Sequence, residues 1–442
     1  MQETSTFYAG YHRIKITPPF GSLIPGYGPL IKRFSDGIIT DLYIYAVAIG
    51  DGENTAVLFN ADALEMSVVG AARVKKLVAE RCKIPEDNVY FCCTHSHTAV
   101  WLSTDEYQNP GDYMPRILQS ACDAATLAIE DMKPCTIKTA VGNVKGVGFV
   151  RRYLMRDGSV KTNPKTADPD IVRPDGLQDD SITLVRLIRD GAKEILIANF
   201  GTHPDMIDGT KYCADWPGFT VDTLKAAFGG EVEAVMLNGA QGDSNHINRF
   251  WPKGHYSTVA FSQRVGRILT GEIMKIYDDA KEIPYGPVKG YFETVPVDKN
   301  TYTEEDVPMA EKINACMKEK GELTPELAAY GMSYKKAVRI LRDLKLPKQI
   351  PVEVSGLQIG SLAFIGISGE PFCEIGIHIK EASPLDTTCV TCLTNGGHGY
   401  FPSAHAYEGG GYESDYSPFG PGCEACLVNG AKNILDQMKN AL

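Results

Sequence analysis

The chain has 442 residues, of which 43% are hydrophobic and 22% are charged, as is usual for a globular protein with a substantial core. Its formal net charge of −11 argues against a nucleic-acid-binding protein, because phosphate neutralisation needs a basic face. No apolar run approaches the ~20 residues that span a bilayer, so stable membrane insertion is not expected.

Strand-like and helix-like segments alternate along the chain, and this alternation predicts a layered α/β (or α+β) protein. Short apolar runs predict strands at 43–49, 56–60, 89–93, 182–188, 195–200, 234–237, 352–367 and 389–393. Apolar residues at helical spacing predict helices near 66–82, 114–132, 217–228, 258–279, 307–345 and 421–440. Gly360 and Ser361 divide the run 352–367 into two halves, which predicts a hairpin and therefore mixed sheets flanked by helices.

The whole chain, 1–442, is predicted to form one domain with a charged helical insertion near 298–348, where Lys and Glu are frequent. The Gly-rich segment 395–413 predicts a long loop, and long ordered loops often carry function. The sequence does not predict the number of subunits.

The cysteines and the N-terminus bear on the compartment. Most of the twelve cysteines lie in apolar or helical patterns, as small buried side chains do in a reducing environment. Two Cys-x-x-Cys pairs begin at Cys389 and Cys423, but the first lies in a strand-like run, so packing is favoured over a structural zinc site. The N-terminus has no apolar stretch typical of a secretory signal, so a cytoplasmic location is expected.

Polar residues with reactive side chains stand where several predicted strands end. Ligand sites of layered α/β proteins gather at the carboxyl ends of strands, so these residues are expected to converge on one pocket. They are Asp62, His95, His97, His203, Asp243, Ser244, Asn245, Glu370, His398 and Tyr400.

The stretch "CTHSH" places His95 and His97 directly after the run 89–93. In an extended segment, side chains two residues apart point to the same side, so both imidazoles are expected to face one pocket. Two such histidines, a distant His203 and a carboxylate suit a catalytic zinc ion, which accepts nitrogen and oxygen ligands and leaves a position for water. The alternative is a pair of hydrogen-bonded histidines in a polar cleft.

Arg151 and Arg152 also follow an apolar run. Adjacent arginines commonly form a solvated face; the alternative is one guanidinium that binds an anion or a carbonyl in the pocket. The Gly-rich stretch "GAQGDSN" lacks the Gly-Lys-Ser/Thr ending of a phosphate-binding loop, which argues against nucleotide binding.

Six stretches, in this order, resemble the N-terminal catalytic domain of the neutral ceramidase superfamily: "AGYHRIKITPPFG", "CTHSH", "ANFGTHP", "NGAQGDSN", "SGEPF" and "TNGGHGY". The likeness extends from about residue 8 to about residue 415. It implies that family's layered α/β fold and one zinc ion per chain, with the ligands His95, His203, Glu370 and Tyr400. It also implies that His97 and Arg151 face the substrate.

The chain departs from the family pattern at the motif Gly-Asp-x-Ser-Pro-Asn. Here Asn245 takes the place of the serine, and Ser244 comes one residue early, after Asp243. The immunoglobulin-like C-terminal domain of ceramidases is also not expected in this chain. The metal ligands are therefore expected to carry over better than the ceramide substrate does.

Together these observations predict a zinc-dependent hydrolase of a small-molecule substrate, which cleaves an amide (N-acyl) bond with metal-activated water. In this hypothesis His97 is the general base or proton shuttle, and Arg151 and Tyr400 stabilise the oxyanion. Asp243, Ser244 and Asn245 complete the predicted catalytic set. The alternatives are a metal-dependent esterase, a hydrolase of a sugar-linked substrate and a non-catalytic metal-binding protein.

Overall fold

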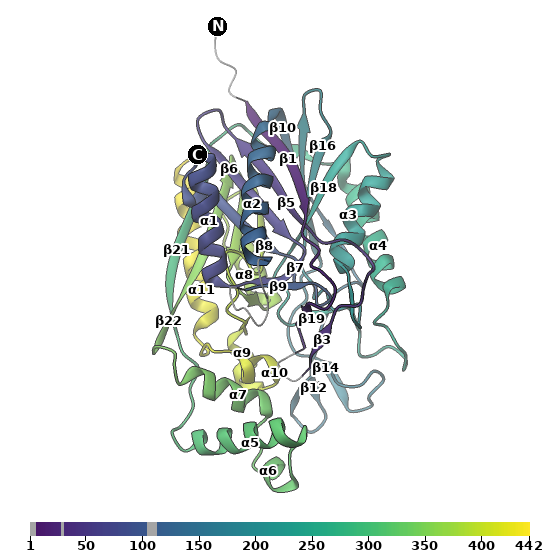
Figure 1. The fold of residues 1–442 in the computed structure, drawn as a ribbon, viewed down its shortest axis with the longest axis vertical. Coiled ribbons are helices and arrows are strands. Elements are labelled where there is room, and N and C mark those ends of the chain that lie inside the picture. Colours follow the sequence, from purple (N-terminus) through teal and green to yellow (C-terminus); the bar gives the residue numbers. More distant parts are fainter. Residues whose placement is uncertain (1–5, 28–30, 104–112) are drawn as a thin grey trace.

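The computed structural model describes residues 6–27, 31–103 and 113–442, and it consists of two stacked β-sheets with helices on their outer faces (Figure 1). The larger sheet has the strand order β18-β16-β15-β10-β1-β5-β6-β8, with β20 paired to β10. Its strands are β1 (Phe7–Lys15), β5 (Tyr43–Gly50), β6 (Thr55–Ala61), β8 (Val89–Cys93), β10 (Lys133–Asn143), β15 (Ser181–Arg189), β16 (Glu194–Phe200), β18 (Val232–Asn238) and β20 (Lys281–Glu282). The smaller sheet consists of β21 (Val288–Asp298), β22 (Gln349–Ile359), β23 (Leu362–Ile367) and β25 (Thr387–Thr391), in that order.

Alternating side chains of the larger sheet supply two separate cores. On β5, Tyr45 and Val47 belong to the core that includes Phe364 of the smaller sheet, whereas Ala46 and Ala48 face the core beneath two helices. Nearly every residue of these central strands is apolar because both faces are covered. The covering helices are α1 (Val68–Cys82) and α2 (Tyr113–Glu130) on this face, α3 (Asp215–Ala227) and α4 (Val259–Tyr277) at the β18 end, and α8 (Cys373–Glu381) and α11 (Cys423–Asn440) on the smaller sheet.

The predicted mixed sheets flanked by helices are confirmed. The pairs β6–β8, β16–β18 and β23–β25 are parallel, and the remaining pairs of the two large sheets are antiparallel. All eight predicted apolar runs coincide with strands, and β22 and β23 form the predicted antiparallel hairpin. Gly360 lies in the turn with φ 55°, in the left-handed region that favours glycine.

Two segments differ in detail from the sequence-based prediction. The helical pattern 307–345 is three helices, α5 (Asp306–Lys320), α6 (Pro325–Ala329) and α7 (Tyr334–Asp343), because Gly321 caps α5 in the left-handed region and Pro325 starts α6. They lie together at one end of the molecule (Figure 1). The segment 395–413 is not one continuous loop, since it contains β26 (Tyr400–Phe401), α9 (Ala404–Gly409) and the start of α10 (Tyr412–Tyr416).

Within the described residues, no helix combines the length and the apolar character needed to cross a bilayer. The twelve cysteines are all free thiols, and Cys389 and Cys392 are buried in the core. No group of three metal-ligating side chains in the described part of the chain includes a cysteine, which agrees with the packing interpretation.

Candidate metal centre

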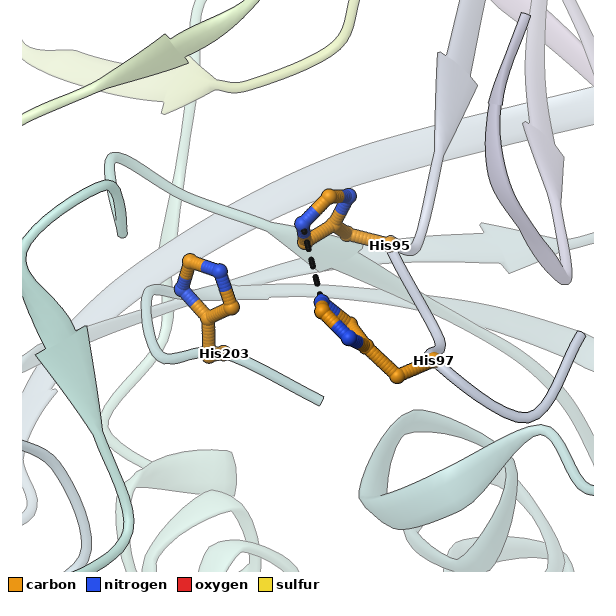
Figure 2. A group of neighbouring side chains, drawn as sticks. All are labelled: His95, His97 and His203. Carbon is orange, nitrogen blue, oxygen red and sulfur yellow. Dashed lines mark hydrogen bonds between the residues drawn. The ribbon is translucent and has the colours of Figure 1, made fainter. Parts of the chain in front are cut away.

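Three buried histidines from two distant parts of the chain converge on one point. His95 and His97 follow β8 and His203 follows β16, and one ring nitrogen from each lies within 4.8 Å of those of the other two (Figure 2). The Nε2 atoms of His95 and His97 are 3.3 Å apart. The predicted convergence of these three side chains is therefore present in the structure.

Backbone carbonyls fix how two of these rings present their nitrogens. His95 Nδ1 lies 2.9 Å from the carbonyl oxygen of Leu64, and His203 Nδ1 lies 3.0 Å from that of Gln241. A carbonyl only accepts hydrogen bonds, so Nδ1 carries the hydrogen in both rings. In the neutral rings the unprotonated Nε2 atoms then face the shared point, as they do in histidines that bind metals.

The backbone that delivers His95 differs from the predicted extended segment. His95 has φ 71°, a left-handed conformation that is uncommon for a residue with a side chain. The side-by-side placement of His95 and His97 therefore comes from a sharp turn after β8 and not from strand alternation. Such strained positions persist where the surrounding structure holds them, often at functional sites; here the His95 amide donates to the carbonyl oxygen of Ala63.

A short two-stranded ladder brings a carboxylate to the same point and a tyrosine ring beside it. β24 (Glu370–Pro371) pairs in parallel with β26, and Glu370 is directly opposite Tyr400. Glu370 Oε2 lies 3.2 Å from His95 Nε2 and 3.3 Å from His203 Nε2. The Tyr400 ring stacks on His203 at a centroid distance of 6.5 Å, and burial raises the pKa of Tyr400 well above its ordinary value.

The spacings of these donor atoms suit a tetrahedrally coordinated metal ion. Bonds of ~2.0–2.1 Å in a tetrahedron place neighbouring ligand atoms about 3.3–3.4 Å apart, close to the spacings between Glu370 and the two histidines. Burial opposes charge on His95, but the Glu370 carboxylate raises the pKa of His95 above its ordinary value. The same two histidines hold the pKa of Glu370 well below its usual range in spite of burial. The centre thus favours a cation among these donors.

His97 differs from the other two histidines in its contacts. Its Nδ1 is buried and has no hydrogen-bond partner in the described part of the chain, and its ring packs 5.0 Å from that of Tyr27. Burial, with help from His95 and His203, holds the pKa of His97 well below its ordinary value. His97 is therefore a neutral imidazole with one uncommitted ring nitrogen.

The structure distinguishes the two adjacent arginines. Arg151 Nη1 lies 3.4 Å from His203 Nε2, and the Arg151 guanidinium lies 5.4 Å from the centre of the Tyr400 ring. Arg152 is fully buried and points elsewhere, toward Asp175 and Glu413. Arg151 is thus the guanidinium that faces the histidines, and neither arginine forms a solvated face.

The stretch Asp243–Asn245 lies beside the centre, but its side chains bond to other groups. Asp243 Oδ1 accepts a hydrogen bond from the first amide of α8, at Cys373, and burial raises the pKa of Asp243 to about 6. Ser244 Oγ donates to Gln178 Oε1 at 2.6 Å, and Asn245 Nδ2 donates to Asn163 Oδ1 at 2.8 Å. Direct catalytic roles for these three residues stay predictions.

Three acidic residues near the centre were not singled out from the sequence as site residues. Glu65, on β7 (Ala63–Met66), has its pKa raised to about 7 by burial and by Glu370. Asp205 Oδ1 lies 3.1 Å from His246 Nδ1, and His97 and His203 also lower the pKa of Asp205. Glu413 is fully buried between Arg151 and Arg152. Of these three residues, only Glu413 has a signal in the sequence, because the pair Tyr412-Glu413 resembles a Tyr-Glu pair of the neutral ceramidase superfamily.

Not every polar strand end joins the site. Asp62 Oδ2 accepts hydrogen bonds from the Tyr43 amide and the Tyr45 hydroxyl, where β6 ends beside the start of β5. His398 packs against Phe419 instead of the histidines. The expectation that all these strand ends converge is therefore too broad.

The buried Asp62 carboxyl predicts a pH-dependent stability. Burial raises the pKa of Asp62 to about 7, above the ~3.9 of an unfolded aspartate, so the folded state retains a proton that the unfolded state releases. This stabilising contribution is complete below about pH 4 and is lost as the pH rises through about 7. In urea unfolding, Asp62→Asn is expected to gain at least about 1 kcal/mol relative to the wild type between pH 5 and pH 8. An equal difference at both pH values would contradict the assignment.

Comparisons with known proteins agree on the fold. The chain matches the crystal structure of neutral ceramidase from Pseudomonas aeruginosa with a TM-score of 0.74 at 15% sequence identity, covering 98% of this chain and 75% of that one. The chain has the neutral ceramidase fold. A structure described as a ceramidase complexed with C2 matches with a TM-score of 0.73, also at 15% identity, covering 98% of this chain and 76% of that one. Sequence comparison matches the chain to no protein-family model and to no curated protein.

The match to this structure confirms the layered α/β architecture that the six ordered motifs imply. Three of the motifs supply the clustered donors: "CTHSH" carries His95, "ANFGTHP" carries His203 and "SGEPF" carries Glu370. The sixth motif, "TNGGHGY", places Tyr400 beside His203.

Proposed function

We propose that this chain is a zinc-dependent hydrolase that cleaves an amide (N-acyl) bond in a small molecule. The observation that carries the proposal is the approach of Glu370 Oε2 to the Nε2 atoms of His95 and His203, at 3.2 and 3.3 Å. Hydrogen bonds to backbone carbonyls orient both rings toward this point. The fold shared with two solved ceramidase structures supports an amide as the scissile bond.

The proposed ligands of one zinc ion are His95, His203, Glu370 and Tyr400. When bound, zinc polarises a substrate carbonyl and lowers the pKa of a water molecule. Tyr400 lies directly opposite Glu370 in the β24–β26 ladder, so its phenol lies on the same side of the ladder as the Glu370 carboxylate. Hydrogen bonds from Gln241 Nε2 to Glu370 and from the Glu370 amide to the Gly399 carbonyl hold the ladder in place.

In this proposal His97 accepts a proton from the attacking water and returns it to the leaving amine. Its depressed pKa keeps it neutral at pH 7, and its Nδ1 is uncommitted, so it has capacity to receive a proton. Tyr27 packs on the ring, and a side chain at Gly26 would reach within 2.8 Å of Nδ1. Tyr27 and the backbone at Gly26 therefore hold the His97 imidazole close to the proposed ligand atoms of His95, His203 and Glu370.

In this proposal Arg151 stabilises the oxyanion. Its Nε donates to Glu413 and its Nη2 donates to the Gly242 carbonyl, and these two bonds fix the plane of the guanidinium. The third nitrogen, Nη1, is directed at His203 next to the ligand atoms. A preorganised cation at this place lowers the energy of negative charge that develops on the carbonyl oxygen. Asp243 acts as a positioning residue, because its carboxylate ties the Gly242–Asn245 turn to α8 after Glu370.

The proposal predicts one equivalent of zinc per chain. Purified protein supplied with zinc is expected to retain about one equivalent by elemental analysis, and a chelator is expected to abolish cleavage of an N-acyl substrate panel until zinc is returned. Retention of less than about a tenth of an equivalent of any transition metal would contradict it. Glu80→Gln, a change on the exposed face of α1, is the control and should retain zinc and activity unchanged.

A further inference from the structure

A carboxylate, an imidazole and a hydroxyl are hydrogen-bonded in series outside the proposed zinc ligands. Asp205 Oδ1 lies 3.1 Å from His246 Nδ1, and His246 Nε2 lies 3.4 Å from Ser257 Oγ. The three residues come from three segments: Asp205 follows β16, His246 follows β19 (Ser244–Asn245), and Ser257 precedes α4. This order of groups is the one that activates a serine as a nucleophile.

The two contacts fix the hydrogen positions on the His246 ring. A carboxylate only accepts hydrogen bonds, so Nδ1 of the neutral ring carries the hydrogen and donates it to Asp205. Nε2 is then the acceptor, and the Ser257 hydroxyl donates to it. A separation of 3.4 Å between serine and base is within the looser range of enzymes without substrate. His246 is buried, whereas Ser257 is half-buried and accessible to a ligand.

The start of α4 lies next to Ser257 in the chain. Thr258 caps this helix, and its side chain accepts the Phe261 amide. The amides of Val259 and Ala260, in the first turn, have no acceptor within the helix, and the helix dipole favours negative charge at this end. A tetrahedral intermediate on Ser257 would develop its negative charge beside these amides, which stabilise an oxyanion.

Three half-buried aromatic rings accompany the serine and its base. The Phe261 ring packs 5.5 Å from that of His246. Tyr256, the neighbour of Ser257 in the chain, packs 5.2 Å from Trp251, and both rings contact Phe261. Each ring keeps part of its surface exposed. An apolar acyl group gains free energy when it covers such rings, so the surroundings of Ser257 favour an apolar substrate.

We propose that Ser257 is the nucleophile of a second hydrolytic site, which cleaves esters of apolar carboxylic acids. Ser257 Oγ forms a bond to the ester carbonyl carbon while its proton moves to His246 Nε2. The bond to the alcohol oxygen then breaks, and the departing alcohol takes the proton from His246. Water next attacks the acyl-serine and gives a proton to His246, and this proton returns to Ser257 Oγ as the carboxylic acid leaves. Asp205 is a positioning residue that holds the His246 ring.

Labelling with an alkyl fluorophosphonate tests the nucleophile, because this probe reacts with serines that a base activates. Peptide mass spectrometry is expected to find the label on Ser257. His246→Gln is expected to slow this labelling at least about 100-fold. The matched control is His255→Gln, which changes an exposed histidine closer to Ser257 in the chain and is expected to have no effect. No label on Ser257, or equal labelling rates in wild type and His246→Gln, overturns the proposal.

Ester cleavage separates this site from the metal centre. The protein is expected to cleave p-nitrophenyl butyrate at the same rate before and after treatment with a chelator. Ser257→Ala is expected to lower this rate at least about 100-fold, whereas Ser159→Ala, at an exposed position, is expected to leave it unchanged. No cleavage, cleavage that the chelator abolishes, or cleavage that Ser257→Ala retains overturns the second site. None of these outcomes depends on whether the protein binds zinc or cleaves an amide.

Discussion

Replacing His97 with alanine is expected to lower the turnover of a cleaved N-acyl substrate about 10²- to 10⁴-fold while zinc content stays near one equivalent. The reason is its contacts: unlike the rings of His95 and His203, the His97 ring has no carbonyl that orients its Nδ1 among the described residues. Its neutral ring is adjacent to the proposed ligands, where it accepts the proton that amide cleavage releases. The measurement is zinc stoichiometry and turnover on the same preparation.

The matched variant is His95→Ala, which is expected to lose zinc and turnover together. Removing a group that only orients a ligand already lowers metal affinity by about 10- to 100-fold. His95 is a proposed ligand itself, with its Nε2 3.2 Å from Glu370 Oε2, so its removal is expected to cost more. Loss of zinc in the His97 variant with retention in the His95 variant would reverse the two roles. Retention in both would identify the histidines as a polar cluster that holds no metal.

Glu413→Gln is expected to destabilise the protein by about 3–5 kcal/mol, because it leaves the buried Arg151 guanidinium without its counter-charge and leaves Arg152 with Asp175 alone. Glu413 Oε1 accepts from Arg151 Nε at 2.8 Å, and Oε2 lies 3.3 Å from Arg152 Nη1. Thr162 Oγ1 also donates to Oε2 at 2.7 Å, so the carboxylate is fully engaged. Urea unfolding monitored by tryptophan fluorescence measures the loss.

The exposed pair Lys76–Glu80 provides the control for this stability change. Its charged atoms are 4.0 Å apart on the surface of α1, and Glu80→Gln is expected to change the free energy of unfolding by less than about 0.5 kcal/mol. A Glu413→Gln loss as small as that of the control would mean that the two arginines find other partners.

Elements with strongly apolar sequences were predictable because burial on both faces leaves little choice of residue. β8 runs between the two cores, and its predicted bounds, 89–93, agree with the structure. β10 was missed because its exposed face carries lysine and threonine, which weakens the apolar signal. The short helix α8 was missed because a helix of nine residues offers few periods of the pattern.

The sequence predicted those residues of the candidate site that come soon after a predicted strand. His95, His203 and Glu370 each come directly after an apolar run, and the structure brings all three together. Asp205 acts through His246, which is 41 positions away in the sequence, so no local pattern distinguishes Asp205 from a surface acid. The long-range pairing of Arg151 with Glu413, 262 positions apart, becomes visible only in three dimensions.

The proposed ligands belong to different structural layers: His95 and His203 follow strands of the larger sheet, while Glu370 and Tyr400 lie in segments that follow strands of the smaller one. The donor set therefore exists only after the two sheets have docked. Metal binding and docking are linked equilibria, since an ion that binds only the docked state stabilises it by about 4 kcal/mol at a concentration 1,000 times the Kd. A bound ion would cross-link the two sheets, so that the opening of their interface and the release of the metal would occur together.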